Sequence, residues 1–510
     1  MSTEKPRKSL ILNAFVEMCS GHQSPGLWRH PEDESHRFND VDHWVELAQL
    51  LESAKFHGIF IADVLGGYDV YKGPRNLDPA IISGAQWPVN EPLAVVPAMA
   101  AATKHIGFGV TVTTTYEPPY HLARRLSTVD HLTKGRIQVV TGYLDSAARN
   151  LGQAEQPHHD DRYLLAEEYI KVAYKLWESS WRQDAVIRDR ERGIYTDPAG
   201  VREINHVGKY YNVPGPHLCQ PSPQRTPVIL QAGTSKAGKT FAAQHAEAIF
   251  VGGHSPSVVA KNVKEIRELA QNEFGRDPRS IKFLALICPV LGKTEEEAIE
   301  KFKHYRSLGS IDGALALFGG WTGIDLDTYG DDEELRHVES NAIRYVKFIQ
   351  VANHADWFRS AVEGWSKATP GVAKWTKATV GQHITVGGLG ATPVGTAAQV
   401  ADNMERWVEE ADVDGFNLVR ALEIQLQILT NFDEQAYAIK PGSFKDIIDL
   451  LIPELRKRGL FWDDYAAPKG TYRENLYGEP GQSGPPADHP ASKYRWKAGV
   501  DAADAPVPEN

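Results

Sequence analysis

Eight short apolar runs recur along the chain, and most are followed by a segment with helical spacing of its apolar residues. The runs cover residues 10–15, 58–64, 106–112, 136–141, 227–232, 248–251, 281–290 and 414–418. Such continuous apolar character is typical of parallel strands buried on both faces. Repeating strand–helix units predict an α/β fold, and eight units favour closure into a TIM-type (β/α)8 barrel. An open doubly wound sheet has the same local pattern and stays an alternative.

The helical segments expected between these runs are residues 41–56, 92–103, 122–132, 161–177, 236–245, 255–274 and 295–305. The repeat places the barrel in residues 9–465. Residues 309–399 do not fit a strand–helix unit, and we interpret them as a lid-like insertion over the C-terminal face of the barrel. Residues 466–510 are rich in proline, glycine and aspartate, which predicts an irregular C-terminal tail that is wrapped on the surface or disordered.

The composition excludes several classes of protein. A net charge of −11 without a lysine or arginine cluster argues against a nucleic-acid partner. No apolar run is long enough to span a bilayer, so we expect no membrane association. Three scattered cysteines make neither a disulfide framework nor a CxxC metal site. The expectation is a soluble cytoplasmic protein.

In a barrel of this type, chemistry lies where strands end and the next loops begin. After the fifth run, the small residues 232–238 lead directly into a helix, an arrangement that suits a phosphate but also fits an ordinary tight turn. His159 and Tyr163 are four residues apart at a helix start and could hold a phosphate together. Taken alone, however, the pair fits a capped surface helix better, because Asp160 and Asp161 favour a helix N-terminus.

Other strand ends carry single polar residues. Asp63 could accept a hydrogen bond from a ring N–H, or it could be a structural carboxylate. His22 and Tyr143 could donate to a substrate, although isolated residues of these types are more often structural. The sequence contains no GxSxG elbow or HExxH motif. Residues 158–161 (HHDD) point in different directions on a helix, so we expect no metal site.

These features coincide in order with a family pattern. Its markers here are NAF at 13–15, GLWRHP at 26–31, IADV at 61–64, YEPPY at 116–120, STVDHLTKGR at 127–136, HDDRY at 159–163, QAGTS at 231–235, GWTGIDL at 320–326 and DGFNL at 414–418. The chain resembles the luciferase-like flavin monooxygenases. It is similar to the branch with nitrilotriacetate, dibenzothiophene-sulfone and long-chain alkane monooxygenases.

The resemblance implies a two-component monooxygenase. A separate NAD(P)H:flavin reductase would supply reduced FMN, and O₂ would add at flavin C4a to give the (hydro)peroxide that oxygenates a small organic substrate. The family tends to form homodimers or homotetramers. The residues implied for FMN are Asp63, Thr111, Thr113, His159, Tyr163 and Ser235, and those implied for the substrate side are His22, Tyr68, Gln86 and Tyr143.

The chain departs from the family pattern twice. After Arg136, about two residues of the usual motif are missing, including a Trp-Asn pair, which would shorten a central strand by roughly 6–7 Å and weaken FMN binding. Residues 419–436 separate DGFNL from the YAxxPGSF motif that it usually precedes. We interpret that segment as a gene-model error, such as an unspliced intron, with a genuine lid insertion as the alternative. Sequencing of the transcript decides between them.

Two other functions stay open at this point. One is a flavin- or F420-dependent reductase of the same superfamily, which would share the barrel. The other is a flavin-binding pseudoenzyme, because both departures fall in walls of the expected flavin site.

Overall fold

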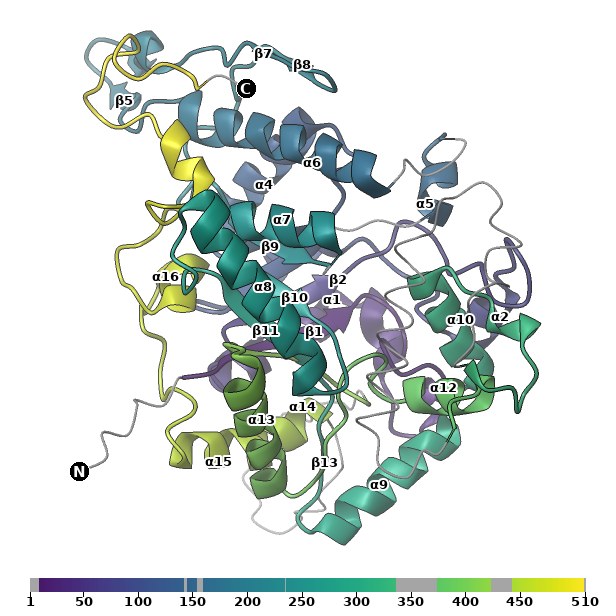
Figure 1. The fold of residues 1–510 in the computed structure, drawn as a ribbon. Coiled ribbons are helices and arrows are strands. Elements are labelled where there is room, and N and C mark those ends of the chain that lie inside the picture. The colour runs from purple at the N-terminus through teal and green to yellow at the C-terminus, as the bar shows by residue number, and fades with distance from the viewer. Residues whose placement is uncertain are drawn as a thin grey trace.

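The computed structural model describes residues 9–141, 145–153, 159–233, 235–335, 374–422 and 443–508. Eight parallel strands close into a barrel in the order β1-β14-β11-β10-β9-β4-β3-β2 (Figure 1). The barrel strands are β1 (Ile11–Glu17), β2 (Gly58–Ala62), β3 (Gly107–Val112), β4 (Ile137–Thr141), β9 (Val228–Ala232), β10 (Ala248–Val251), β11 (Lys282–Ile287) and β14 (Gly415–Val419). All eight predicted strands are confirmed, and closure of the barrel excludes the open sheet.

Helices surround the barrel at the seven places expected from the sequence, and α13 and α15 are two further helices that were not predicted. They are α1 (Val41–Ser53), α3 (Val96–Ala102), α4 (Pro119–Thr133), α6 (His159–Tyr174), α7 (Lys236–His245), α8 (Pro256–Phe274), α9 (Glu295–Leu308), α13 (Ala397–Ala411) and α15 (Ile452–Lys457). Helix α13 shows why such a helix packs on the barrel. Its apolar residues Val400, Met404 and Trp407 recur at helical spacing and are buried in the core that the helices share with the strands. A capping box between Thr396 and Gln399 begins that helix.

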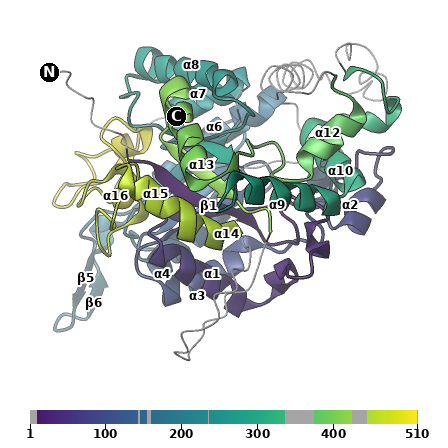
Figure 2. The ribbon, with the colours of Figure 1, turned by 90° about the horizontal axis from the view of Figure 1, so that it is seen from below.

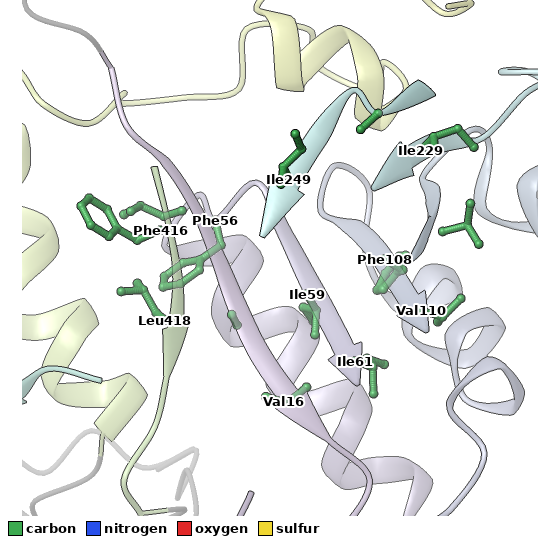
Figure 3. Close-up of a cluster of buried hydrophobic side chains, with 14 of the residues drawn as sticks. Val16, Phe56, Ile59, Ile61, Phe108, Val110, Ile229, Ile249, Phe416 and Leu418 are labelled. Atoms are coloured by element: carbon green, nitrogen blue, oxygen red, sulfur yellow. The ribbon is translucent and has the colours of Figure 1, made fainter. Parts of the chain in front are cut away.

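The side chains of each strand alternate between two cores. Val16, Ile61, Val110 and Leu418 belong to the core between the strands and the surrounding helices (Figure 3). The alternate residues, among them Ile11, Phe60 and Leu284, fill the barrel itself. Because both faces of every strand are buried, the strands read as continuous apolar runs.

Two short hairpins between β4 and β9 were not predicted. One pairs β5 (Val186–Asp189) with β6 (Ile194–Thr196), and the other pairs β7 (His206–Val207) with β8 (Asn212–Val213). Their residues are mostly half-buried or exposed, so they lack the apolar run that marks the barrel strands.

The inserted segment packs beside the C-terminal end of the barrel. Its described helices, α10 (Ile311–Thr322) and α12 (Lys377–Ile384), lie with α2 (Asp78–Ser83) in both views (Figures 1 and 2). Together they form a second core that includes Tyr68, Phe318 and Trp375. Residues 336–373 of the insertion lie outside the described part. Movement of the insertion as a lid stays a prediction.

The C-terminal tail is mostly irregular, as expected, but part of it is buried rather than lying on the surface. It passes from α15 along the barrel to the region of β5 (Figure 1, yellow). Tyr472, at the start of α16 (Tyr472–Tyr477), is fully buried among the residues that fill the barrel. Arg473, also fully buried, makes an ion pair of 2.7 Å with Glu247 at the start of β10. The expectation of a purely superficial tail was therefore wrong for these residues.

Within the segments that the structure describes, no helix combines the length and apolar character needed to cross a membrane.

Candidate functional site

The C-terminal mouth of the barrel has an aromatic floor. Phe15 of β1 stacks on Phe60 of β2 with ring centroids 5.0 Å apart, and Phe60 lies 4.4 Å from Phe250 of β10. These rings close the barrel interior below the site, so groups above them are shielded from water on that side.

A polar cluster lies above this floor, centred on Glu17, the last residue of β1. Gln86 donates its side-chain amide to Glu17 Oε2, and the Cys19 thiol donates to the same oxygen at 3.4 Å. His22 packs its ring edge on Phe15, and its Nε2 lies 4.0 Å from Glu17 Oε2. Two loops and the end of one strand thus meet at a single carboxyl group.

Burial controls the ionisation of this cluster. It raises the pKa of Glu17 to about 7, with a smaller contribution from the charge of Asp63, while the bonds from Gln86 and Cys19 act in the opposite direction. Burial lowers the pKa of His22 to about 3, and the charge of Arg420 adds to the effect. At neutral pH, His22 is therefore uncharged, and Glu17 is protonated to a far greater extent than an exposed glutamate.

The structure brings together three of the four residues predicted for the substrate side. His22 and Gln86 contact or approach Glu17 as described. The hydroxyl of Tyr68 accepts a 3.2 Å hydrogen bond from Nε1 of Trp321 in α10. Burial raises the pKa of Tyr68 well above its ordinary value, and the negative charge of Glu17 acts in the same direction. Tyr143 lies outside the described residues.

Glu17 itself was missed by the sequence analysis because no motif includes it. A signal was nevertheless present. In a strand, Asn13, Phe15 and Glu17 must share one face, and in a barrel strand that face points inward. A carboxyl group at the inner C-terminal end of a barrel strand therefore had to lie at the mouth.

A second cluster lies where β9 passes into α7. Ser235 is the N-cap of α7, and its Oγ accepts a 3.1 Å hydrogen bond from the N–H of Gly238. The Tyr163 side chain extends from α6 onto the same turn, since a Cβ at Gly238 would lie 2.7 Å from its hydroxyl oxygen. Gly233 has φ +127°, a conformation that favours glycine. The side chains predicted to hold a phosphate, Tyr163 and Ser235, are thus adjacent at a helix N-terminus.

The geometry of this second cluster fits a phosphate group. A helix N-terminus presents free backbone N–H groups and a positive dipole end to an anion. Tyr163 can add a hydroxyl donor from a different element. Gln231 Oε1, buried next to this turn, has no hydrogen-bond partner among the described residues. His159 is the first residue of α6, and its side chain lies outside the description.

The other residues predicted for the cofactor lie at the ends of β2 and β3. Asp63 directly follows β2 and lines a cavity of about 390 Å³ with Trp87, Asp69 and Arg149. Burial raises the pKa of Asp63 to about 6, with a further contribution from Glu91. Thr111 shares the inward face of β3 with Gly109, whose Cβ position lies 3.0 Å from Phe60. Thr113 is buried, and its hydroxyl accepts a 3.2 Å hydrogen bond from the N–H of Thr115.

The two departures from the family pattern can be followed only in part. Strand β4 pairs with β3 over five residue pairs and with β9 over three, so the short strand still closes the barrel. Weaker FMN binding stays a prediction. Of residues 419–436, the described ones include Val419, Ala421 and Leu422, which are buried in one apolar cluster. Residues 423–442 lie outside the description, so the origin of that segment stays a hypothesis.

The contact between the insertion and Tyr68 makes one glycine critical. A Cβ at Gly320 would lie 1.9 Å from Cδ1 of the buried Tyr68 ring. We expect Gly320→Ala to displace Tyr68 and to lower the free energy of unfolding by about 1–3 kcal/mol in urea. Gly330→Ala in the same insertion is the control, because its Cβ would lie 3.7 Å from the nearest atom. Equal effects of the two substitutions would contradict the packing described here.

Comparison with known proteins identifies the family of this chain. The family model for luciferase-like monooxygenases matches residues 18–415. The chain is 47% identical over 490 residues to the long-chain alkane monooxygenase of Geobacillus thermodenitrificans (strain NG80-2), which covers 96% of this chain and 98% of that relative. It is 44% identical over 491 residues to the dimethyl-sulfide monooxygenase of Hyphomicrobium sulfonivorans, covering 96% and 94% of the two chains.

One of the similar solved structures contains a flavin. A riboflavin lyase with modified FMN and riboflavin superposes with a TM-score of 0.79 at 32% identity, covering 96% of this chain and 100% of that one. The full-length matches include the barrel, the insertion and the tail. The chain is therefore a monooxygenase that belongs to the luciferase-like monooxygenase family.

Proposed function

We propose that this enzyme is the oxygenase of a two-component system that uses reduced FMN and O₂ to oxygenate a small organic substrate. A separate NAD(P)H:flavin reductase is the expected partner and meets the oxygenase in the cytoplasm. The observation that carries the proposal is the turn after β9, where Tyr163 and Ser235 meet the N-terminus of α7. It provides a phosphate site at the same end of the barrel as the polar cluster around Glu17.

Each group of residues has a role in this proposal. Tyr163, Ser235 and the first N–H groups of α7 bind the phosphate, and the family resemblance adds His159 to this group. Asp63, Thr111 and Thr113 face the ribityl chain and ring system. His22, Tyr68, Gln86 and Tyr143 orient the substrate, while the aromatic floor and the inserted helices exclude water. Reduced FMN, when bound, supplies the two electrons that place one oxygen atom of O₂ in the substrate and release the other as water.

The test separates this proposal from the two alternatives. The purified protein is titrated anaerobically with reduced FMN and then mixed with O₂ in a stopped-flow instrument. Binding followed by a long-lived absorbance that belongs to neither reduced nor oxidised FMN supports the oxygenase. Binding without such a species favours a reductase, and absence of binding favours a pseudoenzyme.

Two substitutions test the phosphate site directly. Tyr163→Phe and Ser235→Ala should each weaken binding of reduced FMN by about 1–2 kcal/mol, because each removes one protein hydroxyl that would donate a hydrogen bond to the charged phosphate. Fluorescence or absorbance titration under anaerobic conditions measures the affinity. Unchanged affinity in both variants would refute the assignment.

Ser235→Ala also removes a helix cap, so it needs a matched control. Thr294 caps α9 by the same geometry, accepting a 3.2 Å hydrogen bond from the N–H of Glu297. Thr294→Ala should lower stability by about 1 kcal/mol, as expected for a lost cap, and leave the affinity for reduced FMN unchanged.

A further inference from the structure

Glu17 has the surroundings of a neutral carboxylic acid. Its side chain is fully buried above the rings of Phe15 and Phe60. The polar groups that contact or approach it are an amide, a thiol and an uncharged imidazole. A buried carboxylate is stable only when cations or several strong donors compensate its charge. No cation is among these groups, so the burial of Glu17 outweighs its two hydrogen-bond donors and favours the protonated acid.

The same carboxyl group connects the residues that face the substrate. One oxygen, Oε2, accepts from Gln86 and Cys19 and is the atom nearest to His22. The other oxygen, Oε1, has no hydrogen-bond partner among the described residues. Nε2 of His22 likewise makes no hydrogen bond to any of them. Gln86 has φ +51°, which is uncommon outside glycine, and this conformation is kept at the position where its amide reaches Glu17.

We propose that Glu17 is a positioning residue that is neutral in the working enzyme and holds Gln86 and His22 as an uncharged polar wall for the substrate. This inference rests on the proposed function. The wall suits an uncharged organic molecule with a polar atom near the site of oxygenation. Above neutral pH, Glu17 ionises, and the mouth then holds two carboxylates, Glu17 and Asp63, which repel anions and reduce the supply of protons.

The charged and titratable groups around Glu17 come from several elements. Cys19 and His22 follow β1, Asp63 and Tyr68 follow β2, and Arg420 follows β14 and acts on His22. Burial raises the pKa of Glu17 to about 7, and the charge of Asp63 acts in the same direction. The hydrogen bond from Gln86 opposes this shift because it stabilises the ionised form.

Infrared difference spectroscopy tests the proton directly and needs neither flavin nor substrate. The wild-type enzyme should show a carboxylic-acid C=O band that disappears with a midpoint near pH 7. Glu17→Gln should lack this band, whereas Glu454→Gln, at a surface ion pair with Lys457, should retain it. A wild-type spectrum without the band between pH 6 and 8, or a band that survives in Glu17→Gln, overturns the proposal.

A second variant keeps the test valid if Glu17→Gln folds poorly. Gln86→Met removes the amide donor but keeps the side-chain length. The midpoint of the band should then move to higher pH, because the ionised carboxylate loses a hydrogen bond. An unchanged midpoint would show that Gln86 and Glu17 are not coupled and would refute the positioning role.

The functional part of the test follows the rate at which O₂ reoxidises bound reduced FMN to FMN and hydrogen peroxide, without substrate. The wild-type rate should change with pH around 7, and the Glu17→Gln rate should be flat there. The same pH profile in both proteins overturns the role of Glu17 in the mouth. Failure to bind reduced FMN at any pH refutes the proposed function instead, and the infrared result still decides the state of Glu17.

Discussion

Arg473→Met is expected to lower the free energy of unfolding by about 3–5 kcal/mol, because it leaves a buried carboxylate without its partner. Both Arg473 and Glu247 are fully buried, with Nε–Oε2 and Nη2–Oε1 distances of 2.7 and 2.8 Å. Arg473 also donates to the carbonyl oxygen of Thr226 at 2.9 Å and to that of Ser483 at 2.6 Å. One side chain therefore joins the tail to the start of two barrel strands.

The size of this effect should depend on pH. Burial alone would raise the pKa of Glu247, but the charge and hydrogen bonds of Arg473 hold it below the ordinary value of 4.5. The pair therefore stabilises the wild-type fold above that pH, and the contribution is lost as pH falls through the lowered pKa. In the variant, the ionised form of Glu247 lacks a cationic partner. The loss of stability relative to the wild type should therefore be largest at pH 7 and should become smaller below about pH 4.5.

Urea unfolding followed by circular dichroism measures the difference. Lys457→Met is the control. This substitution also removes an ion pair, the one between Lys457 and Glu454, but the side chain of Lys457 is 77% exposed. That variant should change stability by no more than about 0.5 kcal/mol. Similar losses in both variants would mean that the tail is not anchored by Arg473.

Tyr472→Ala is expected to cost about 3–5 kcal/mol of stability, the range for removal of a buried aromatic side chain. The ring closes the N-terminal end of the barrel, where Gly58 and Gly107 begin β2 and β3. A Cβ at Gly107 would lie 2.1 Å from Cδ2 of this ring, and one at Gly58 would lie 3.2 Å from Cε2. The barrel therefore contains no room for both a side chain at Gly107 and the tyrosine.

This steric relation can be tested with a double-mutant cycle. Gly107→Ala alone should destabilise by about 1–3 kcal/mol, because the tyrosine ring must move. In the Tyr472→Ala background the same substitution should cost less, since the new methyl group enters the vacated space, giving a coupling of about 0.5–3 kcal/mol. Gly252→Ala, with no atom within 4 Å of its Cβ position, is the control. Strict additivity would place Tyr472 outside the barrel.

Most of the barrel could be predicted from the sequence. Runs such as residues 58–64 and 281–290 are apolar at nearly every position, which only strands covered on both faces require. The small hairpins of residues 186–196 and 206–213 could not be predicted, because short half-exposed strands depend on their neighbours for pairing rather than on their own composition. The order of the eight strands also followed from the chain, since right-handed strand–helix units place consecutive strands side by side.

The candidate site was predicted less completely. Tyr163 and Ser235 were expected together at a phosphate site, and the structure places the hydroxyl of Tyr163, from α6, against the turn where Ser235 caps α7. Glu17 was not expected, because an isolated glutamate in an apolar run has no motif. Its significance depends on Gln86 and His22, which are 69 and five positions away in the chain, and only the fold brings the three side chains together.

The class of fold, and the end of the barrel at which chemistry is expected, can be inferred from the chain alone, because hydrophobic periodicity is a local property. The residues that close the N-terminal end of the barrel, and the ionisation of the groups at its C-terminal mouth, depend on tertiary contacts. The proline- and glycine-rich tail has the composition of a surface segment, yet Tyr472 fills the barrel and Arg473 neutralises Glu247. Burial likewise turned Glu17 from an ordinary carboxylate into a group with a pKa of about 7. Both results depend on contacts between residues far apart in the chain, and those contacts set the local dielectric environment and the available space.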